Sequence, residues 1–176
     1  FIVIAVLSIM LLSASWISLR TTSLPRRILL VNAINAIVIG GVTVLIIMTQ
    51  AVLTIKPWYD PSYLIPLAGM IFANCMNGIS LAAERLESEL NQGKSFKEAK
   101  VIALKTSLIP ITNMLLAVGL VSLPGMMTGQ ILSGVSPMIA VRYQIMVMCM
   151  FFGSTGISVA VFLQSVRGHF NNKEIS

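Results

Sequence analysis

The stretch GLVSLPGMMTGQILSGVSP, residues 119–137, decides how this chain folds, because it has the composition of a loop without the charge of one. It contains four glycines and two prolines but no Asp, Glu, Lys or Arg. A surface loop of a water-soluble domain would normally carry charged residues. The stretch lies within residues 106–141, a charge-free run of 36 residues. As one helix, that run would measure about 54 Å, which overshoots a bilayer.

The run must therefore be broken. Leu123-Pro124-Gly125 is the predicted break, because proline and glycine end a helix there, near the outer face of the membrane. Ser136 and Pro137 then provide the N-cap and the first residue of the next helix. Between them, Met126 to Ser133 is apolar enough to stay at membrane depth as a half-helix. Non-helical backbone at that depth is tolerated only when it is buried in protein or lines a water-filled cavity. We predict a broken or re-entrant segment near Pro124-Gly125.

The composition of the whole chain indicates lipid as its solvent. Of 176 residues, 56% are hydrophobic and 10% are charged, against roughly 25% charged in soluble domains. Five charge-free runs reach the ~18–20 residues that cross a bilayer. They predict an all-α, polytopic membrane bundle of about five helices, in one permease domain over residues 1–176, with spans at 1–19, 28–54, 62–82, 101–123 and 138–164. The first run is apolar from Phe1 onward and has no initiator Met, so we expect the chain to be N-terminally incomplete.

Basic residues are sorted between alternate connections of the predicted bundle. The segments between charge-free runs one and two, between runs three and four, and after run five hold Arg20, Arg26, Arg27, Arg85, Lys94, Lys97, Lys100, Lys105, Arg167 and Lys173. The external turn KPWYDPSY, residues 56–63, holds only Lys56, beside aromatic residues typical of a membrane surface. This positive-inside pattern places the basic connections and the C-terminus in the cytoplasm of a multi-pass inner-membrane protein. The net charge of +6 is not gathered on one face, so we expect no nucleic-acid partner.

The most polar part of the chain is LAAERLESELNQGKSFKEAK, residues 81–100. Arg85 and Glu89 form an i,i+4 pair, and Gly93 is placed to end their helix. Ser95 and Glu98 then form a capping box that opens a second helix. We predict a cytoplasmic loop at residues 84–100, built of two short helices that meet at a glycine corner. Such a loop is either a solvated hairpin or a docking element for a cytoplasmic partner.

Polar residues inside the spans are predicted to face inward. Asn32, Asn35, Thr43 and Gln50 share one face of span two, Asn74 and Asn77 share one of span three, and Thr106, Asn113 and Ala117 share one of span four. They serve either as interhelical hydrogen-bonding groups or as the lining of a polar translocation path. Arg142 lies about one turn inside a span, where a guanidinium must snorkel, pair or face water.

The sequence holds no catalytic pattern. Asp60 is the only Asp, and no P-loop, HExxH or Ser-His-Asp arrangement is present, so an energy source must come from another chain. Cys75 and Cys149 are single cysteines within spans and are expected to behave as small apolar residues. Met126 and Met127 offer soft sulfur ligands to a metal, although with 11 methionines in the chain packing is the alternative. Gly125 and Gly129 form a small-xxx-small pattern.

Three runs of the sequence resemble a known family. They are IPLAGMIFANCMNGISLAAERL (65–86), GKSFKEAKVIALKTSLIPITN (93–113) and VGLVSLPGMMTGQILSGVSPMIAVRYQIMVM (118–148). Together they resemble the FetB/YbbM family of ABC-transporter membrane subunits, over about residues 64–164. The resemblance implies a non-catalytic permease subunit, a homodimer of such subunits, and a cytoplasmic ABC ATPase subunit that binds ATP and Mg. It also implies metal handling, with iron export in bacteria and aluminium tolerance in plant relatives.

The leading hypothesis, a permease subunit of an ABC transporter, assigns roles to two groups of residues. ATPase coupling is assigned to the polar loop, at Glu87, Glu89, Gly93, Ser95, Glu98 and Ala99. The translocation path or gate is assigned to Asn74, Asn77, Asn113, Pro124, Gly125, Met126, Met127, Gln130 and Arg142. No cofactor is expected on this chain, and no metal-ligand set is assigned. An ion-gradient transporter or channel is the alternative, but it would need an intramembrane ion site and the spans hold no carboxylate. A scaffold without transport is a third possibility.

Overall fold

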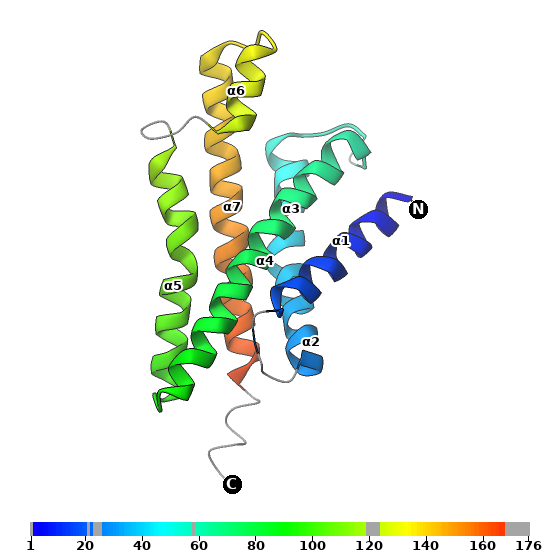
Figure 1. Ribbon diagram of the computed structural model, residues 1–176. Helices are drawn as coiled ribbons and strands as arrows, with labels where there is room; N and C mark the ends of the chain where they lie inside the picture. The colour runs from blue at the N-terminus through cyan, green and yellow to red at the C-terminus, as the bar shows by residue number, and fades with distance from the viewer. Residues whose placement is uncertain (1, 21, 23–25, 58, 119–123, 168–176) are drawn as a thin grey trace.

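A computed structural model describes residues 2–20, 22, 26–57, 59–118 and 124–167, without the side chains of 26–28. Its elements are helices, which confirms the all-α class (Figure 1). In chain order they are α1 (Ile2–Ser18), α2 (Arg26–Ile37), η1 (Val38–Val42), α3 (Thr43–Ile47), η2 (Met48–Val52), α4 (Pro61–Asn91), α5 (Phe96–Ala117), α6 (Gly125–Leu132) and α7 (Pro137–Ser165).

Four helical segments are long and apolar enough to cross a membrane. They are the continuous helix Leu29–Val52, and α4, α5 and α7, of 24, 31, 22 and 29 residues. The first predicted span corresponds to α1, a shorter apolar helix of 17 residues. The chain is therefore a polytopic helical membrane protein, and the five predicted spans correspond to four long apolar helices and a shorter one.

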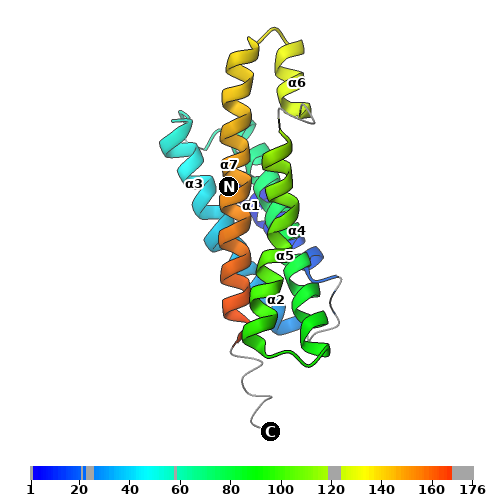
Figure 2. The same ribbon diagram turned by 90° about the vertical axis from the view of Figure 1, so that its left-hand side faces the viewer.

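Helix α7 runs the length of the molecule, with α5 beside it and α4 crossing it obliquely (Figures 1 and 2). The α4–α5 turn lies at the same end of the molecule as the C-terminal end of α7, and α6 lies at the opposite end. Thr22 Oγ1 donates a 2.6 Å hydrogen bond to Glu87 Oε2. Lys100 Nζ, near the start of α5, donates to Gln164 Oε1 on α7. We call this the basic end, and the end formed by residues 53–57 and 59–63 and by α6 the far end.

Small residues let α7 approach its neighbours closely. A Cβ atom added to Gly40 would lie 2.3 Å from Ser158 Oγ and 2.6 Å from Ser158 N. A Cβ added to Gly78 of α4 would lie 2.5 Å from Thr155 Cγ2. Ser158 Oγ also donates a 3.3 Å hydrogen bond to the buried Cys75 Sγ. Small residues on both sides of an interface allow this close helix packing in lipid. By contrast, Gly125 and Gly129 of the predicted small-xxx-small pattern have no neighbouring atom within 4 Å of an added Cβ.

The predicted inward polar face of span two is wrong. Asn32 is half-buried, but Asn35, Thr43 and Gln50 are exposed on this chain. Two π-helical segments, η1 and η2, interrupt the span. Because a π turn closes i→i+5 hydrogen bonds, it rotates the side chains that follow η1, which include Thr43 and Gln50, away from the register of an ideal helical wheel, whereas Asn35 precedes both segments.

Two other polar positions also depart from the predicted orientation. Asn77 of α4 and Asn113 of α5 are exposed rather than inward-facing. Their partners on the same predicted faces, Asn74, Thr106 and Ala117, are half-buried. The predicted polar faces of these two spans therefore lie at the edge of the bundle rather than at its centre.

The predicted boundaries are confirmed in part. Helix α4 continues through the polar segment to Asn91, so the two short loop helices are instead the ends of two long helices, because no proline or glycine lies between Gly78 and Gly93. Helix α5 ends at Ala117, earlier than predicted. Pro124 is the N-cap of α6, which confirms the predicted half-helix after it. Ser136 and Pro137 open α7 as predicted, although the Ser136 side chain forms no capping hydrogen bond. Trp58, Leu123 and the tail from 168 lie outside the described residues.

Candidate functional site

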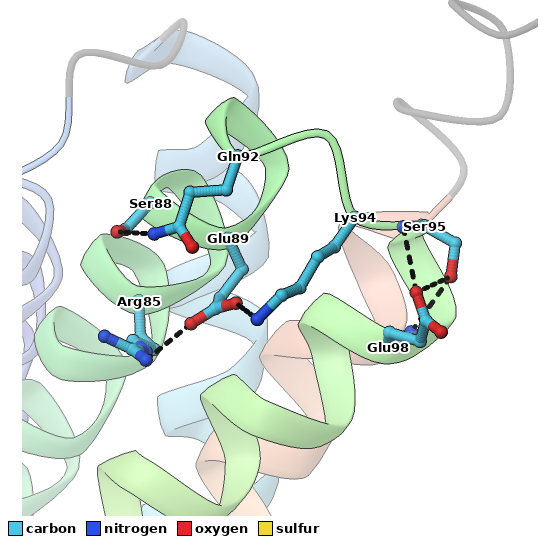
Figure 3. Close-up of polar contacts among 7 residues, drawn as sticks. All are labelled: Arg85, Ser88, Glu89, Gln92, Lys94, Ser95 and Glu98. Carbon is cyan, nitrogen blue, oxygen red and sulfur yellow. Dashed lines mark hydrogen bonds and ion pairs between the residues drawn. The ribbon is translucent and has the colours of Figure 1, made fainter.

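The first candidate site is the corner between α4 and α5, shown in Figure 3. Gly93 has φ +81°, a left-handed conformation that glycine adopts at least cost. Its N–H donates to the Leu90 carbonyl at 3.0 Å, and the Lys94 N–H donates to the Glu89 carbonyl at 3.3 Å. These bonds satisfy the last carbonyls of α4, as in other glycine-terminated helices. The chain reverses here within a few residues, so α4 and α5 run antiparallel.

The buried carboxylate of Glu89 links the end of α4 to the turn at the corner. The Glu89 side chain is fully buried, and its Oε1 lies 2.5 Å from Arg85 Nη2. Its Oε2 accepts a hydrogen bond from Lys94 Nζ, beyond Gly93 (Figure 3). This part of α4 is charged and lies beyond the apolar span. The hydrogen bond from Lys94, aided by the charge of Arg85, lowers the pKa of Glu89 even though desolvation opposes that shift. Glu89 therefore joins the end of α4 to the turn that follows it.

The second half of the corner is a capping box, as predicted. Ser95 Oγ accepts from the Glu98 N–H at 3.4 Å, and Glu98 Oε2 accepts from the Ser95 N–H at 3.3 Å. The two side chains are also joined, by a 2.9 Å bond from Ser95 Oγ to Glu98 Oε2. The box satisfies two free backbone amides at the start of α5. It fixes the direction in which α5 leaves the corner.

The predicted coupling residues separate into an exposed and an internal group. Gly93, Ser95 and Glu98 are exposed, whereas Glu89 and Ala99 are fully buried. Glu87 is half-buried and accepts the hydrogen bond from Thr22 described above. The exposed surface continues into a shallow hollow of about 490 Å³, lined by Ser95, Lys97, Glu98, Val101 and Ile102. The exposed residues can contact a partner, while the buried ones can only hold the shape of the corner.

The second candidate site is a cavity of about 620 Å³ at the far end. Residues preceding α4, the start of α4, α6, and the start of α7 contribute to its wall. The lining residues are Leu53, Ile55, Lys56, Ser62, Tyr63, Pro66, Leu67, Met70, Met126, Gln130, Val135, Tyr143, Met146 and Val147. The wall is mostly apolar, with a few hydroxyl, amide and amino groups, which is a composition typical of small-molecule sites.

Some of the predicted path residues come together at this end. Met126 and Gln130 line the cavity, and Arg142 lines an adjoining hollow of about 320 Å³. Pro124 and Gly125 open α6, and Met127 is buried.

The three predicted path asparagines are not brought together in this cavity. Asn74 is half-buried on α4, and its amide donates to the Met70 carbonyl at 2.8 Å. The exposed Asn77 and Asn113 belong to neither hollow.

Sequence reasoning missed several residues of the cavity wall. The polar residues Lys56, Ser62, Tyr63 and Tyr143 of the wall were not predicted as site residues, and Met70 and Met146 add thioethers. In the sequence, Lys56 and Tyr63 indicate only a surface turn and an aromatic belt. The signal in the sequence was the positive-inside pattern, which predicts that the turn at 56–63 and the break near Pro124 lie on the same side of the membrane. Within the described residues, no three His, Cys, Asp or Glu side chains cluster as a metal site.

Residues 1–170 match the model of the Uncharacterised protein family (UPF0014). The chain belongs to this family. The family includes proteins described as membrane proteins, which agrees with the apolar helices of the fold. The UPF0014 membrane protein slr1647 of Synechocystis sp. is 38% identical over 154 residues, covering 77% of the chain and 60% of the relative.

Two further relatives carry functional names. The Probable iron export permease protein FetB of Escherichia coli is 31% identical over 161 residues, covering 81% of the chain and 60% of the relative. Protein ALUMINUM SENSITIVE 3 of Arabidopsis thaliana is 34% identical over 115 residues, covering 57% and 42%. The chain thus spans about 60% or less of the length of these relatives. No solved structure matches the chain.

Proposed function

We propose that this UPF0014 chain forms part of the permease subunit of an ATP-binding-cassette exporter in the inner membrane. Two copies of the permease would pair with cytoplasmic ATPase subunits, which bind ATP and Mg and perform the hydrolysis. The C-terminus would face the cytoplasm, as the sorting of basic residues favours. Iron is the first candidate cargo, because one relative is named a probable iron export permease.

The proposal rests on the corner between α4 and α5 at the basic end, where Glu89 bonds to residues on both sides of Gly93. Glu89 and the capping box make the corner stiff, and the corner is the start of α5 itself. A partner that pushes on Ser95, Lys97 and Glu98 would therefore displace the first turns of α5, a helix of 22 residues that contains Pro110. At about 1.5 Å per residue, α5 extends ~33 Å from the corner, toward the end where α6 begins. A docking surface needs both exposure and a rigid support, and this corner has both.

The alternative, a transporter driven by an ion gradient, lacks a sequence feature that it needs. Residues 61–83, 106–141 and 143–166 contain no Asp or Glu. Intramembrane carboxylates are the usual ion and proton sites of such transporters. The ATP-driven mechanism needs no such group in this chain.

The test compares two glycines with matched backbone geometry. Gly93 has φ +81° and Gly134 has φ +90°, and neither has an atom within 4 Å of an added Cβ. Alanine at either position costs about 1–2 kcal/mol of left-handed strain, but only Gly93 belongs to the corner. We expect Gly93→Ala to reduce both co-purification of the ATPase and ATP-dependent iron efflux from vesicles. Gly134→Ala should keep ATPase binding at the wild-type level. Equal ATPase binding by both variants would show that the corner is not the docking site.

A further inference from the structure

The two hollows at the far end adjoin each other. Leu53, Tyr143 and Met146 line both of them. The cavity of about 620 Å³ contains Lys56 in its wall, and the hollow of about 320 Å³ contains Arg142. Tyr143 thus belongs to both walls, one of which includes Lys56 and the other Arg142.

The charges in these walls are all positive. Neither hollow is lined by an Asp, Glu, His or Cys residue, so no acidic group is present in the described lining. Among the described residues, the ion pairs within 4.0 Å join Glu89 to Arg85 and to Lys94, at the other end of the molecule. Lys56 and Arg142 therefore have no acidic partner in this part of the chain. Both side chains are exposed on this chain, and an arginine within an apolar span is costly where that exposed surface meets lipid rather than water or a counter-charge.

The remaining polar groups of the wall are suited to an oxygen-rich ligand. Ser62, Tyr63 and Tyr143 each carry a hydroxyl that can donate a hydrogen bond. Gln130 carries an amide, and its Oε1 is buried without a hydrogen-bond partner. An unpartnered buried polar atom costs free energy, and a ligand hydroxyl or a water would satisfy it. The rest of the main cavity is apolar and includes Pro66, Leu67, Met70 and Met126.

We propose that these hollows bind an organic anion with an apolar body, whose carboxylate or phosphate group lies between Lys56 and Arg142. The proposal rests on the proposed transport function and names the chemical class of its cargo. Hard metal cations prefer carboxylate and other oxygen ligands, and two positive charges oppose any bare cation. Methionine thioethers suit a soft cation, but here they share the wall with those same charges. Metal would thus enter this site as an anionic complex with an organic ligand.

The size of the site supports this class of ligand. A main cavity of about 620 Å³ lies within the ~300–1,000 Å³ range of small-molecule sites. Arg can hold a carboxylate or phosphate through two parallel hydrogen bonds, and Lys adds a point charge. The same anionic chemistry could come from a membrane lipid or from a soluble chelator, and the test separates these two sources.

The test measures ligand binding to the purified protein in a neutral detergent, without the ATPase. The probe is dodecyl phosphate, and its controls are dodecanol, which has no charge, and inorganic phosphate, which has no apolar body. We expect saturable binding of dodecyl phosphate, seen as a rise in melting temperature and as a 1:1 complex in native mass spectrometry. Dodecanol, inorganic phosphate and Fe²⁺ alone should each bind at least ten-fold more weakly. Competition by phosphatidate would indicate the lipid source, and competition by the anionic iron(III) complex of 2,3-dihydroxybenzoate, which has aromatic rings, the soluble source.

Substitutions of the two basic wall residues test whether dodecyl phosphate binds in these hollows. The double variant Lys56→Gln/Arg142→Gln should weaken dodecyl phosphate binding at least ten-fold, while Arg142→Lys alone should retain most of it. Lys105→Gln/Arg167→Gln removes the same charge from exposed positions away from the hollows and should bind as the wild type does. The melting temperature without ligand checks that each variant folds. Wild-type binding by the Lys56/Arg142 variant, or equal binding of dodecanol, would overturn the proposal. Because no ATPase is present, that result would leave the proposed docking corner standing.

Discussion

The close contact between Gly40 and α7 allows a stability prediction in which two chemically identical substitutions have opposite effects. In Gly40→Ala, the new methyl would lie 2.3 Å from Ser158 Oγ, 2.6 Å from Ser158 N and 2.9 Å from Ser154 O. Two of these atoms belong to the backbone of α7, so relief requires the helices to move apart. Overpacking of this kind costs about 1–3 kcal/mol, and rigid backbone neighbours favour the upper end. Replacing a helical glycine by alanine returns about 0.5–1 kcal/mol. We expect a net loss of about 2 kcal/mol.

The matched control is Gly156→Ala, in α7 itself. An added Cβ there has no neighbouring atom within 4 Å, so only the helix-propensity gain of about 0.5–1 kcal/mol applies. The two variants should differ by about 3 kcal/mol in free energy of unfolding, with opposite signs relative to the wild type. Denaturation by dodecyl sulfate in mixed micelles, followed by circular dichroism, measures the difference. If Gly40→Ala proved as stable as Gly156→Ala, the close packing of this span on α7 would be refuted.

Two further predictions concern the helix starts and the corner. Ser95→Ala should destabilise the protein by about 1 kcal/mol, whereas Ser136→Ala should cost less because its side chain makes no capping bond; the same denaturation assay compares them, and equal losses would contradict the capping geometry. The lowered pKa of Glu89 means that its ion pairs contribute at neutral pH and are lost as the pH falls through that pKa, below the ordinary glutamate range. Hydrogen-exchange protection factors around Gly93, which are corrected for the intrinsic pH dependence of amide exchange, should therefore fall on acidification, and in Glu89→Gln they should be low already at neutral pH and no longer depend on pH.

Much of the fold could be predicted because lipid permits few solutions. The lengths of the runs without charged residues predicted the apolar helices. The residue types at the helix ends predicted the Ser95 capping box, the Gly93 corner and the start of α6 after Pro124. The register of span two could not be predicted, because the π segments depend on packing between helices rather than on local preference. The continuation of α4 to Asn91 was missed because a change from apolar to polar residues marks the end of a span, not the end of a helix.

The candidate sites were predictable to different degrees. The corner is local in sequence, so the spacing of Glu89, Gly93 and Ser95 was enough to place it. The cavity combines residues from separated segments, and only Met126 and Gln130 of its lining were predicted. The unpaired Arg142 was the signal that the sequence offered, since a charge inside a span needs an explanation. Finding Lys56 beside the same site required knowing which helix ends meet.

Helix α4 reaches from one candidate site to the other without interruption. Its first turns supply Tyr63 and Met70 to the cavity, and its last turns supply Arg85 and Glu89 to the corner. Near its midpoint, Gly78 packs closely against Thr155 of α7. A helix held by close packing near its middle would pivot about that contact. A sideways displacement at the corner would thus move the part of α4 beyond Gly78 the opposite way, as far as Pro66, where the helix lacks one backbone hydrogen bond.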